Sequence, residues 1–252
     1  MRRYALRDDQ WDRIKDILPG REGHVGATAK DNRLFVEAVL YRYRAGIPWR
    51  DLPERFGDPI KVHTRFSRWA KPRRMEEALR NAGRRRGQRI RHDRQHYRAC
   101  APAQCRCSKK DGDDQAIGRS KGGLSTKIHA MVDALGNPLA FFLTAGQAHD
   151  LQGADALLPQ MQADTLLADK AFDADERVIE PLLAAGKMPV IPPKSNRKSP
   201  RPYDKEIYKA RHLMENFYCK LKQYRAIATR YDKTARNFLA SIHLAAAVIW
   251  LN

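Results

Sequence analysis

The sequence is organised around one stretch of fifteen residues, Tyr208-Lys-Ala-Arg211-His-Leu-Met-Glu215-Asn-Phe-Tyr-Cys-Lys-Leu-Lys222. On a helix, where each residue advances by about 100°, four polar residues fall within an arc of about 60°. These four are Tyr208, Arg211, Glu215 and Lys222. The opposite side carries residues suited to a core, namely Ala210, Leu213, Met214, Phe217, Leu221 and Tyr224. The pattern therefore predicts a helix that buries one face and presents a carboxylate among cations on the other.

Two interpretations fit this polar face. A carboxylate flanked by cations suits metal-dependent attack on a phosphodiester, because the acid can bind the metal and the cations can bind phosphates. A solvent-exposed face held by salt bridges, with no function of its own, fits the periodicity as well. The periodicity does not decide between them.

The spacing Y-x2-R-x3-E-x6-K resembles the signature around the glutamate of bacterial insertion-sequence DDE transposases. The continuation, Gln223-Tyr-Arg-Ala-Ile-Ala-Thr-Arg-Tyr-Asp-Lys-Thr234, resembles the insertion-sequence-five-like group of these enzymes. The likeness runs over residues 1–71 and 108–252, whereas residues 72–107 do not fit it. It implies a transposase that binds element ends and catalyses DNA strand cleavage and transfer with Mg²⁺ or Mn²⁺. It also implies a homo-oligomer acting on transposon ends and target DNA.

Composition independently indicates a nucleic-acid-binding protein. The chain has 48 Lys and Arg against 29 Asp and Glu, a formal net charge of +19 and a pI near 10.1, as expected of a polyanion binder. Its four cysteines do not make a disulfide framework, and no apolar signal segment opens the sequence. The apolar run at residues 238–251 is too short to span a bilayer and predicts a buried helix. We therefore expect a soluble, cytoplasmic, nucleoid-associated protein.

Residues 1–71 are predicted to form a helical DNA-binding domain. Helices are expected at residues 10–18, 34–45, 48–56 and 60–71, with Gly57-Asp58-Pro59 as the turn before the last. One side of this last helix carries Lys61, Thr64, Arg65 and Arg68. A short helix, a turn and a basic helix are typical of a helix-turn-helix, whose second helix enters the major groove. A helical bundle with a charged surface remains the alternative.

Residues 108–252 are predicted to form a mixed α/β domain. Residues 127–133 and 138–143 give a hairpin, residues 165–168 a buried strand and residues 188–192 another short strand. Helices are expected at residues 150–161 and 175–185, before the 208–222 helix and the C-terminal helix. The succession is similar to the RNase H-like core, a mixed sheet with flanking helices, that the resembled family uses.

Two carboxylates are the predicted catalytic and metal-binding residues. Asp169 follows the buried strand at residues 165–168, where α/β proteins usually place ligands, and by resemblance it matches the family's second acid. Without that match, Asp169 would be interpreted as a turn-forming residue. Glu215 matches the third acid. The resemblance further implies that Arg211 and Lys222 contact transposon-end phosphates and that Tyr208 lines the cleft.

Three other motifs are weaker. His149-Asp150 could be a metal-binding pair, but a loop histidine followed by a helix cap explains it. Cys100, Cys105 and Cys107, with His92 and His96, suggest zinc, yet the segment contains no CxxC pair. Gly122-Gly123 lacks the strand and following helix of a phosphate loop.

The family's first acid is missing from its expected place. That place falls in residues 72–107, which carry 11 Arg and no Lys against 3 acids and show no strand alternation. Such a composition is typical of disorder. A frameshift is the more specific hypothesis. Codons for the stretch from His92 onward can be chosen so that the reading frame shifted by one base encodes M-I-D-S-T-I-V-R-A-H-Q. This peptide resembles the family's first-acid motif. The lost aspartate codon would straddle Arg94 and Gln95, and Asp93 is the nearest carboxylate present.

We therefore predict a transposase whose catalysis is impaired because one acid of the triad is missing. Loss of one ligand from a two-metal site is costly, since metal placement and electrostatic stabilisation fail together. Two alternatives stay open: a non-catalytic DNA-binding remnant that competes for transposon ends, and a metal-dependent endonuclease without end preference.

Overall fold

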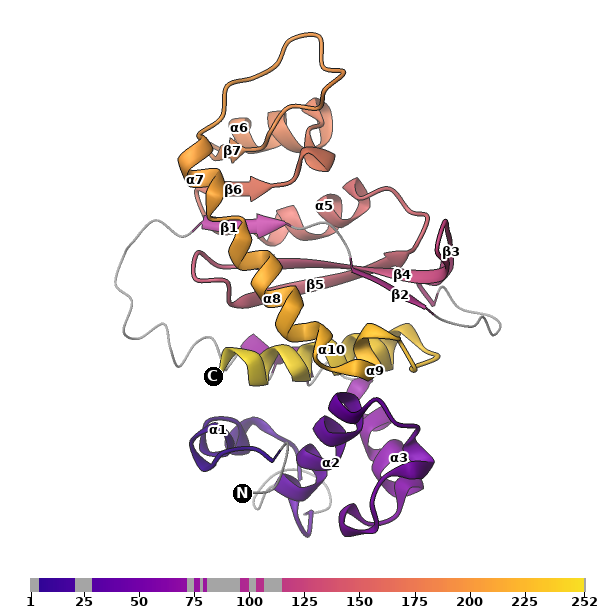
Figure 1. Ribbon diagram of the computed structural model, residues 1–252. Coiled ribbons are helices and arrows are strands. Elements are labelled where there is room, and N and C mark those ends of the chain that lie inside the picture. The colour runs from indigo at the N-terminus through magenta and orange to yellow at the C-terminus, as the bar shows by residue number, and fades with distance from the viewer. Residues whose placement is uncertain are drawn as a thin grey trace. The chain divides into compact units, whose positions relative to one another are not determined.

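The computed structural model describes residues 5–20, 29–71, 75–77, 79–80, 96–99, 103–106 and 115–251 (Figure 1). The chain forms two compact units. Unit 1 comprises Met1–Arg89, Lys109–Gln115 and Lys220–Asn252, and unit 2 comprises Ile90–Ser108 and Ala116–Cys219. The C-terminal helices therefore belong with the N-terminal ones, whereas the sequence placed them with the α/β domain at residues 108–252.

Unit 1 is helical. Its α-helices are α1 (Asp8–Ile14), α2 (Asn32–Ala45), α3 (Pro59–Ala70), α9 (Arg225–Ala228) and α10 (Ala235–Trp250). Local chemistry sets the bounds of α2: Asp31 accepts a hydrogen bond from the Leu34 amide at 2.8 Å, and Gly46 ends the helix with a φ of 71°. At Gly46 a Cβ atom would also lie 2.7 Å from Cβ of Arg225, so the C-terminal segment packs closely on this cap.

The predicted third helix at residues 48–56 is wrong. Two 3₁₀ turns, Trp49–Asp51 and Glu54–Phe56, take its place. Pro53 lies between them with a ψ of 141°, and it disfavours helical geometry at the preceding Leu52, so no continuous helix can form. The next helix is confirmed as α3, where the Asp58 carboxylate accepts from the Ile60 amide at 2.8 Å.

A buried polar network joins α2 to the turn before α10. The Arg42 and Asp232 side chains are 2% and 4% exposed, and Arg42 Nη1 lies 3.3 Å from Asp232 Oδ2. The Tyr43 hydroxyl donates to the same oxygen at 2.7 Å. Burial raises the pKa of Tyr43 well above its usual value, so the hydroxyl stays a donor. Arg42 also lies over the Trp49 ring, 4.8 Å from its centroid.

We predict that Asp232→Ala strongly destabilises unit 1. The substitution leaves the buried Arg42 charge without its carboxylate, a loss of roughly 3–5 kcal/mol. Urea unfolding followed by tryptophan fluorescence measures it, because all four tryptophans (Trp11, Trp49, Trp69 and Trp250) lie in unit 1. Asp12→Ala, which breaks the exposed pair with Lys15, is the control and leaves the midpoint nearly unchanged. Equal effects of the two substitutions would contradict the prediction.

Unit 2 is built on one sheet. Its strands are β1 (His96–Ala99), β2 (Ala103–Arg106), β3 (Gly118–Ser120), β4 (Gly123–Val132), β5 (Pro138–Ala145), β6 (Thr165–Ala168) and β7 (Met188–Val190). Met131 pairs with Ala99 of β1 and with Ala140 of β5, so β1 and β5 lie on opposite edges of β4. The order is then β5, β4, β1, β6, β7, with β5–β4–β1 antiparallel and β1, β6 and β7 parallel.

Strands β1 and β2 lie inside the Arg-rich segment, where the sequence showed no strand alternation. This expectation was wrong for these two stretches. β1 pairs with β6 over four residues, from His96 opposite Thr165 to Ala99 opposite Ala168. Backbone hydrogen bonds to strands on both sides can hold a strand whatever the pattern of its side chains. Residues 81–95, 100–102 and 107–114, including Asp93 and Cys107, lie outside the described part of the chain.

Helices cover both faces of the sheet. All four residues of β6 are buried, as a strand covered on both faces requires. On one face Met131, Leu166 and Ala168 pack with Leu151 and Ala154 of α5 (Leu151–Leu157) and with Leu182 of α6 (Glu180–Ala184). On the other face Phe141 of β5 stacks on Phe217 of α8 (His212–Lys222), with ring centroids 5.8 Å apart. Tyr218 of α8 donates to the Ile128 carbonyl at 2.6 Å.

The helices of unit 2 are shorter than predicted. The helix expected at residues 150–161 is α5 followed by a 3₁₀ turn, Leu158–Gln160, because Pro159 cannot continue the α-helical bonding. The one expected at residues 175–185 begins as a π turn, Asp175–Ile179, and becomes α6 at Glu180. The hairpin is confirmed as β4–β5, with Gly136 in its turn at a φ of 83°.

His129 is a buried histidine between β5 and α5. It is 1% exposed, and its Nε2 lies 2.8 Å from the Thr144 hydroxyl. A Cβ atom at position 153 would lie 2.2 Å from its Nδ1, so only glycine lets α5 approach so closely. Burial, with Lys127 nearby, lowers the pKa of His129 to about 4 against the opposing effect of Asp150. The folded state therefore holds His129 neutral.

We predict that unit 2 loses stability as the pH falls from about 6.5 to about 4. The unfolded histidine takes up a proton in this window and the folded one does not, so acid favours unfolding, by on the order of 3 kcal/mol across the window. Far-UV circular dichroism during urea unfolding at several pH values measures the slope. The slope becomes shallower in His129→Leu and stays unchanged in the control His212→Gln, which alters an exposed histidine. An unchanged slope in His129→Leu would contradict the assignment.

Candidate functional site

Asp169 lies where the sequence placed it, at the carboxyl end of the buried strand β6. Its backbone is extended, with φ of −68° and ψ of 159°, and it opens the 3₁₀ turn Lys170–Phe172. The Phe172 amide donates to the Asp169 carbonyl at 2.9 Å. Because β1 runs parallel to β6, the carboxyl ends of both strands meet at this edge of the sheet.

The predicted helix over residues 208–222 is broken. It consists of α7 (Lys205–Lys209) and α8, with Ala210 and Arg211 between them. Through the break the backbone makes bonds of the i to i+3 type: the Arg211 amide donates to the Tyr208 carbonyl at 2.9 Å, and the Met214 amide to the Arg211 carbonyl at 3.0 Å. Residues three apart superpose in such a turn. The break therefore places Arg211 over Tyr208, with its guanidinium carbon 5.8 Å from the ring centroid.

Arg211 joins the two predicted acids. Its Nη1 lies 4.0 Å from Asp169 Oδ2, and its Nη2 donates to Glu215 Oε1. Asp169 comes from β6 and Glu215 from α8, so segments distant in sequence converge on one cation. The side chains of Arg211, Asp169 and Glu215 are 23%, 29% and 54% exposed, which leaves the group open to a ligand.

Tyr208 forms one wall of this group. Burial raises its pKa, Arg211 opposes the rise and Asp169 adds to it, so the phenol stays protonated at neutral pH. The Tyr203 ring packs edge-on against Tyr208, with centroids 5.5 Å apart. Of the predicted residues, Asp169, Glu215, Arg211 and Tyr208 are brought together. Lys222 is the exposed last residue of α8 and belongs to unit 1.

Sequence reasoning missed a second charged cluster close to Asp169 in the chain. Asp173 is buried; one of its oxygens accepts from the Lys194 amide at 2.8 Å, and the other pairs with Arg197. Arg197 Nη2 also binds both oxygens of Asp175 at 2.6 Å, and Arg201 pairs with Asp175. These intramolecular bonds occupy the carboxylates of both Asp173 and Asp175. No motif spacing would have predicted this cluster, because the aspartates and their partners in the 194–201 segment are about twenty residues apart in sequence.

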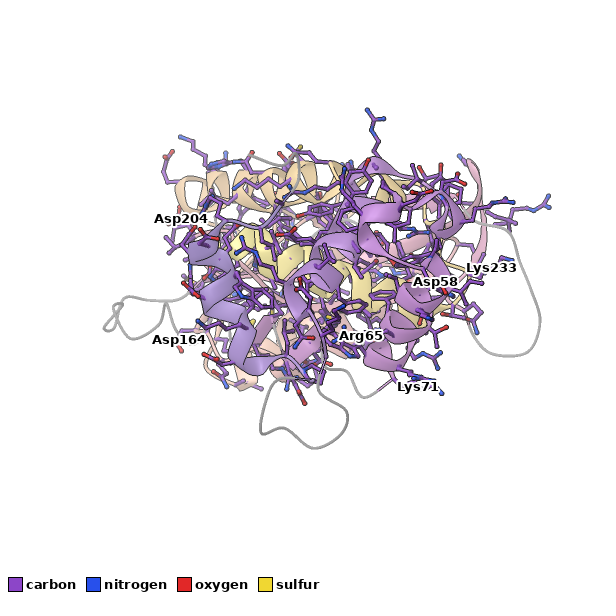
Figure 2. The ribbon with its side chains drawn as sticks, turned by 90° about the horizontal axis from the view of Figure 1, so that it is seen from below. Asp58, Arg65, Lys71, Asp164, Asp204 and Lys233 are labelled. Atoms are coloured by element: carbon purple, nitrogen blue, oxygen red, sulfur yellow. The ribbon has the colours of Figure 1, made fainter. Side chains whose placement is uncertain are left out.

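The basic face of α3 is confirmed in part. Lys61, Thr64 and Arg68 are exposed. Arg65 is half-buried: its guanidinium lies over the Phe35 ring at 4.1 Å and the Trp69 ring at 4.9 Å, and it donates to Asn32. These contacts pack α3 against α2 and account for Arg65 without DNA. Asp58, Arg65 and Lys71 mark the start, the middle and the end of the helix region in Figure 2.

The structure gives little support to a metal site at His149-Asp150 or at the cysteine–histidine group. The exposed His149 accepts from the Leu151 amide at 3.3 Å, and the Asp150 carboxylate binds Lys127 at 2.7 Å and not the helix amides. In the described part of the chain no three His, Cys, Asp or Glu side chains are grouped as a metal site would require. His92, Cys100 and Cys107 lie outside that part. Its helices also include none long and apolar enough to cross a membrane.

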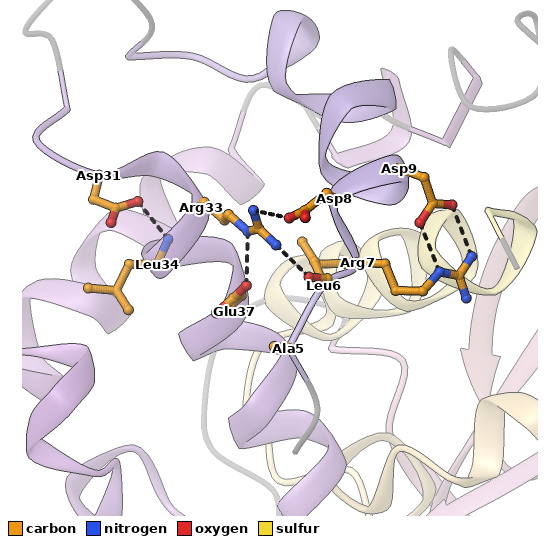
Figure 3. Close-up of a pocket in the computed structure, with 9 residues that line it drawn as sticks. All are labelled: Ala5, Leu6, Arg7, Asp8, Asp9, Asp31, Arg33, Leu34 and Glu37. Atoms are coloured by element: carbon orange, nitrogen blue, oxygen red, sulfur yellow. Dashed lines mark hydrogen bonds and ion pairs between the residues drawn. The ribbon is translucent and has the colours of Figure 1, made fainter. Parts of the chain in front are cut away.

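A separate pocket lies in unit 1 (Figure 3). It has a volume of about 610 Å³ and lies between the start of α1 and the first turns of α2. Arg33 crosses it, pairing with Asp8 and Glu37 and donating to the Leu6 carbonyl at 2.7 Å. None of the predicted catalytic residues lines it.

Comparisons with known proteins give two family matches. Residues 6–79 match the family described as "Putative transposase of IS4/5 family", and residues 84–250 match the "Transposase DDE domain" family. Only residues 80–83 separate the two matches, which therefore cover most of the Arg-rich segment at residues 72–107, where the sequence motifs showed no likeness to the family.

Two relatives are similar over parts of the chain, and no solved structure matches it. A "Putative transposase for insertion sequence element IS6501" from Brucella ovis is 40% identical over 132 residues, which are 51% of this chain and 99% of that protein. The uncharacterized protein y4sN from Sinorhizobium fredii is 45% identical over 75 residues, 30% of this chain and 60% of that protein. With a family match over residues 84–250, the chain belongs to the DDE transposases of insertion sequences, of the IS4/5 type.

Proposed function

We propose that this chain binds the ends of an insertion sequence and that its own strand cleavage and transfer are impaired. The observation that carries the proposal is the convergence of Asp169 and Glu215 on Arg211, on a sheet that lacks a carboxylate in strand β1. Family membership supplies the reaction class, phosphoryl transfer on DNA.

The sheet supports an RNase H-like core for unit 2. The order β5, β4, β1, β6, β7, with an antiparallel first part and a parallel second part, is what such a core requires. In this arrangement acids on β1 and after β6 face each other at one edge of the sheet. Asp169 supplies the acid after β6.

The two acids fit a divalent metal by their chemistry. Mg²⁺ and Mn²⁺ prefer carboxylate oxygens and retain several waters, so Asp169 and Glu215 would hold the ion. The metal, when bound, supplies a Lewis acid for the phosphodiester. Arg211 already lies against both carboxylates, and it can move to a phosphate once their charge is otherwise balanced. The Arg211 guanidinium lies over the Tyr208 ring, 5.8 Å from its centroid.

The missing acid is the reason to expect impaired catalysis. β1 consists of His96, Tyr97, Arg98 and Ala99. Its parallel neighbour is β6, and Asp169 follows β6 directly in the chain. The frameshift hypothesis places the first acid at Arg94–Gln95, just before β1, and neither these two residues nor the four of β1 are carboxylates. Asp93 precedes the strand and lies outside the described residues. Two acids out of three place a metal poorly, and catalysis falls by orders of magnitude when one part of such a unit is removed.

In this proposal, DNA binding does not depend on the missing first acid. Lys61, Thr64 and Arg68 present an exposed polar face on α3, which we propose as the helix of a helix-turn-helix-like domain that contacts DNA. Lys222 adds an exposed cation at the end of α8. The net charge of +19 supports association with a polyanion. This separation of binding from chemistry favours the DNA-binding remnant over the general endonuclease.

We predict that the purified chain binds DNA carrying the element's ends but does not cleave it in Mg²⁺ or Mn²⁺. Glu215→Ala leaves end binding within about twofold, whereas Lys61→Ala with Arg68→Ala weakens it at least tenfold through lost phosphate contacts. Gel-shift and nicking assays measure both. Strand transfer that Asp169→Ala abolishes would show that the chain is an intact enzyme, and cleavage without end preference would indicate an endonuclease.

The gene sequence across codons 70–110 tests the cause of the impairment. If the adjacent frame spells the I-D-S-T stretch, two single-base repairs restore an aspartate at the Arg94–Gln95 position, just before β1, and we predict that the repaired protein nicks element ends. The unrepaired protein is the matched control. A repaired protein that stays inactive, or an adjacent frame without this stretch, would contradict the frameshift.

We predict that Arg211→Ala binds Mn²⁺ more tightly than the wild-type chain, by roughly tenfold. The substitution removes a cation that neutralises Asp169 and Glu215 and so competes with the metal. Electron paramagnetic resonance of free Mn²⁺ measures the affinity without any need for catalysis. Arg177→Ala, which removes an exposed arginine paired with Asp155, is the control and changes nothing. Equal or weaker Mn²⁺ binding by Arg211→Ala would show that Arg211 does not occupy the metal's place.

A further inference from the structure

We propose that residues 191–204 form a preorganised strap that binds the phosphate backbone of DNA next to Asp169 and Glu215. The proposal rests on the proposed function and adds to it a surface outside the catalytic residues. Figure 1 shows this strap as a long excursion between β7 and α7. Its sequence contains four cations, Lys194, Arg197, Lys198 and Arg201, against one acid, Asp204.

The first end of the strap is held to the segment that carries Asp169. Asp173 lies four residues after Asp169, and its carboxylate accepts from the Lys194 backbone amide at 2.8 Å while pairing with Arg197. Both partners lie in the strap and Asp173 is buried, so the attachment is shielded from water. The position of the strap and that of Asp169 are therefore coupled through one short turn.

Arg197 organises the middle of the strap. Its guanidinium binds Asp173 and Asp175, and its Nε donates to the Ser199 carbonyl at 3.0 Å. The Arg197 amide also donates to the Lys194 carbonyl at 3.1 Å, which closes a turn. A planar guanidinium with several donors can fix two carboxylates and a backbone carbonyl at once. Arg201 pairs with Asp175 and extends the attachment.

The second end of the strap returns to the candidate site. Tyr203 packs on Tyr208, whose ring lies beneath Arg211. Asp204, the only acid of the strap, accepts from the Glu206 and Ile207 amides at 2.8 and 2.9 Å and so caps α7. Both ends of the strap are thus fixed beside residues of the site, and its acid is used to start a helix.

Two lysines remain available for a ligand. Arg197 and Arg201 are engaged with aspartates, whereas the ammonium groups of Lys194 and Lys198 have no carboxylate partner within the described residues. Lys198 is exposed and Lys194 half-buried. A surface with cations that no acid among the described residues neutralises fits a polyanion, and a fixed backbone spares the entropy of ordering a loop on binding. The partner that fits this surface is the DNA duplex held at the candidate site.

The test compares two double variants of the full chain. In the strap variant, Lys194→Ala and Lys198→Ala are combined. The control, Lys15→Ala with Lys209→Ala, removes the same charge from exposed lysines that pair with Asp12 and Glu206. Fluorescence anisotropy with a labelled duplex, over a series of salt concentrations, gives the affinity and its salt dependence. We expect the strap variant to lose about two phosphate contacts, so that its salt slope is shallower by about 1.8 and its affinity falls on the order of tenfold at 0.1 M salt.

A second variant separates the order of the strap from its charge. Arg197→Lys keeps the net charge but cannot reproduce the fork that joins Asp173 and Asp175. We expect it to weaken duplex binding severalfold and to speed tryptic cleavage after Lys198. Limited trypsin digestion also shows whether the rest of the chain stays folded, because the cleavage should be confined to the strap.

The outcomes distinguish this proposal from the proposed function. A wild-type chain that binds no DNA would reject both. A strap variant that matches the Lys15 and Lys209 control in slope and affinity, while the wild type still binds element ends, would overturn the strap alone. Unchanged binding by Arg197→Lys would overturn the claim that the strap is preorganised.

Discussion

Burial of β6 on both faces is the constraint on which the architecture of unit 2 depends. Its four residues, Thr165 to Ala168, are all buried, so helices must cover the sheet on each side. Packing by α5 and α6 on one face and α8 on the other meets this requirement. Because a buried strand cannot carry a charge along its length, the first carboxylate after it, Asp169, emerges at the sheet edge. The same packing of α8 brings Glu215 to that edge.

Several arginines of this chain make contacts inside the protein, whereas several lysines lie at or near its surface. Several guanidiniums are engaged inside the protein: Arg42 with Asp232 and aromatic rings, Arg65 over Phe35 and Trp69, and Arg197 between two aspartates. Guanidinium suits such places because it stacks on rings and makes several planar hydrogen bonds. The lysines at positions 61, 194, 198 and 222 are exposed or half-buried. Internal contacts therefore account for these three arginines, whereas these four lysines lie at or near the surface.

The candidate site combines a local device with a distant contact. The i to i+3 bonds at residues 208–214 superpose Tyr208 and Arg211, which is a property of a few consecutive residues. The approach of Arg211 to Asp169 joins residues more than forty positions apart and depends on the whole sheet. Strand β1 lies between β4 and β6 and runs parallel to β6, so the carboxyl ends of these two strands meet at the edge where Asp169 lies.

Several elements could be predicted from sequence because their causes are local. Strand 165–168, the β4–β5 hairpin and the buried face of α8 follow from hydrophobic periodicity, while Gly46 ends α2 because glycine tolerates a positive φ. Two predicted helices were wrong for local reasons. Pro53 divided a predicted helix into two turns, and a break at Ala210 divided the 208–222 helix without any proline or glycine to announce it.

The sequence by itself predicted the two candidate acids, Asp169 and Glu215, and their cationic neighbours, since a residue type and its spacing are fully contained in the chain. That the first acid of the resembled family is missing stays a prediction from sequence. Only the tertiary structure decided that Arg211 spans both acids, that Asp173 and Asp175 are engaged by Arg197, and that Arg65 packs against rings. The physical reason is that these interactions join side chains from separate elements. Their distances are set by how sheets and helices pack, and periodicity describes only the face on which each residue lies.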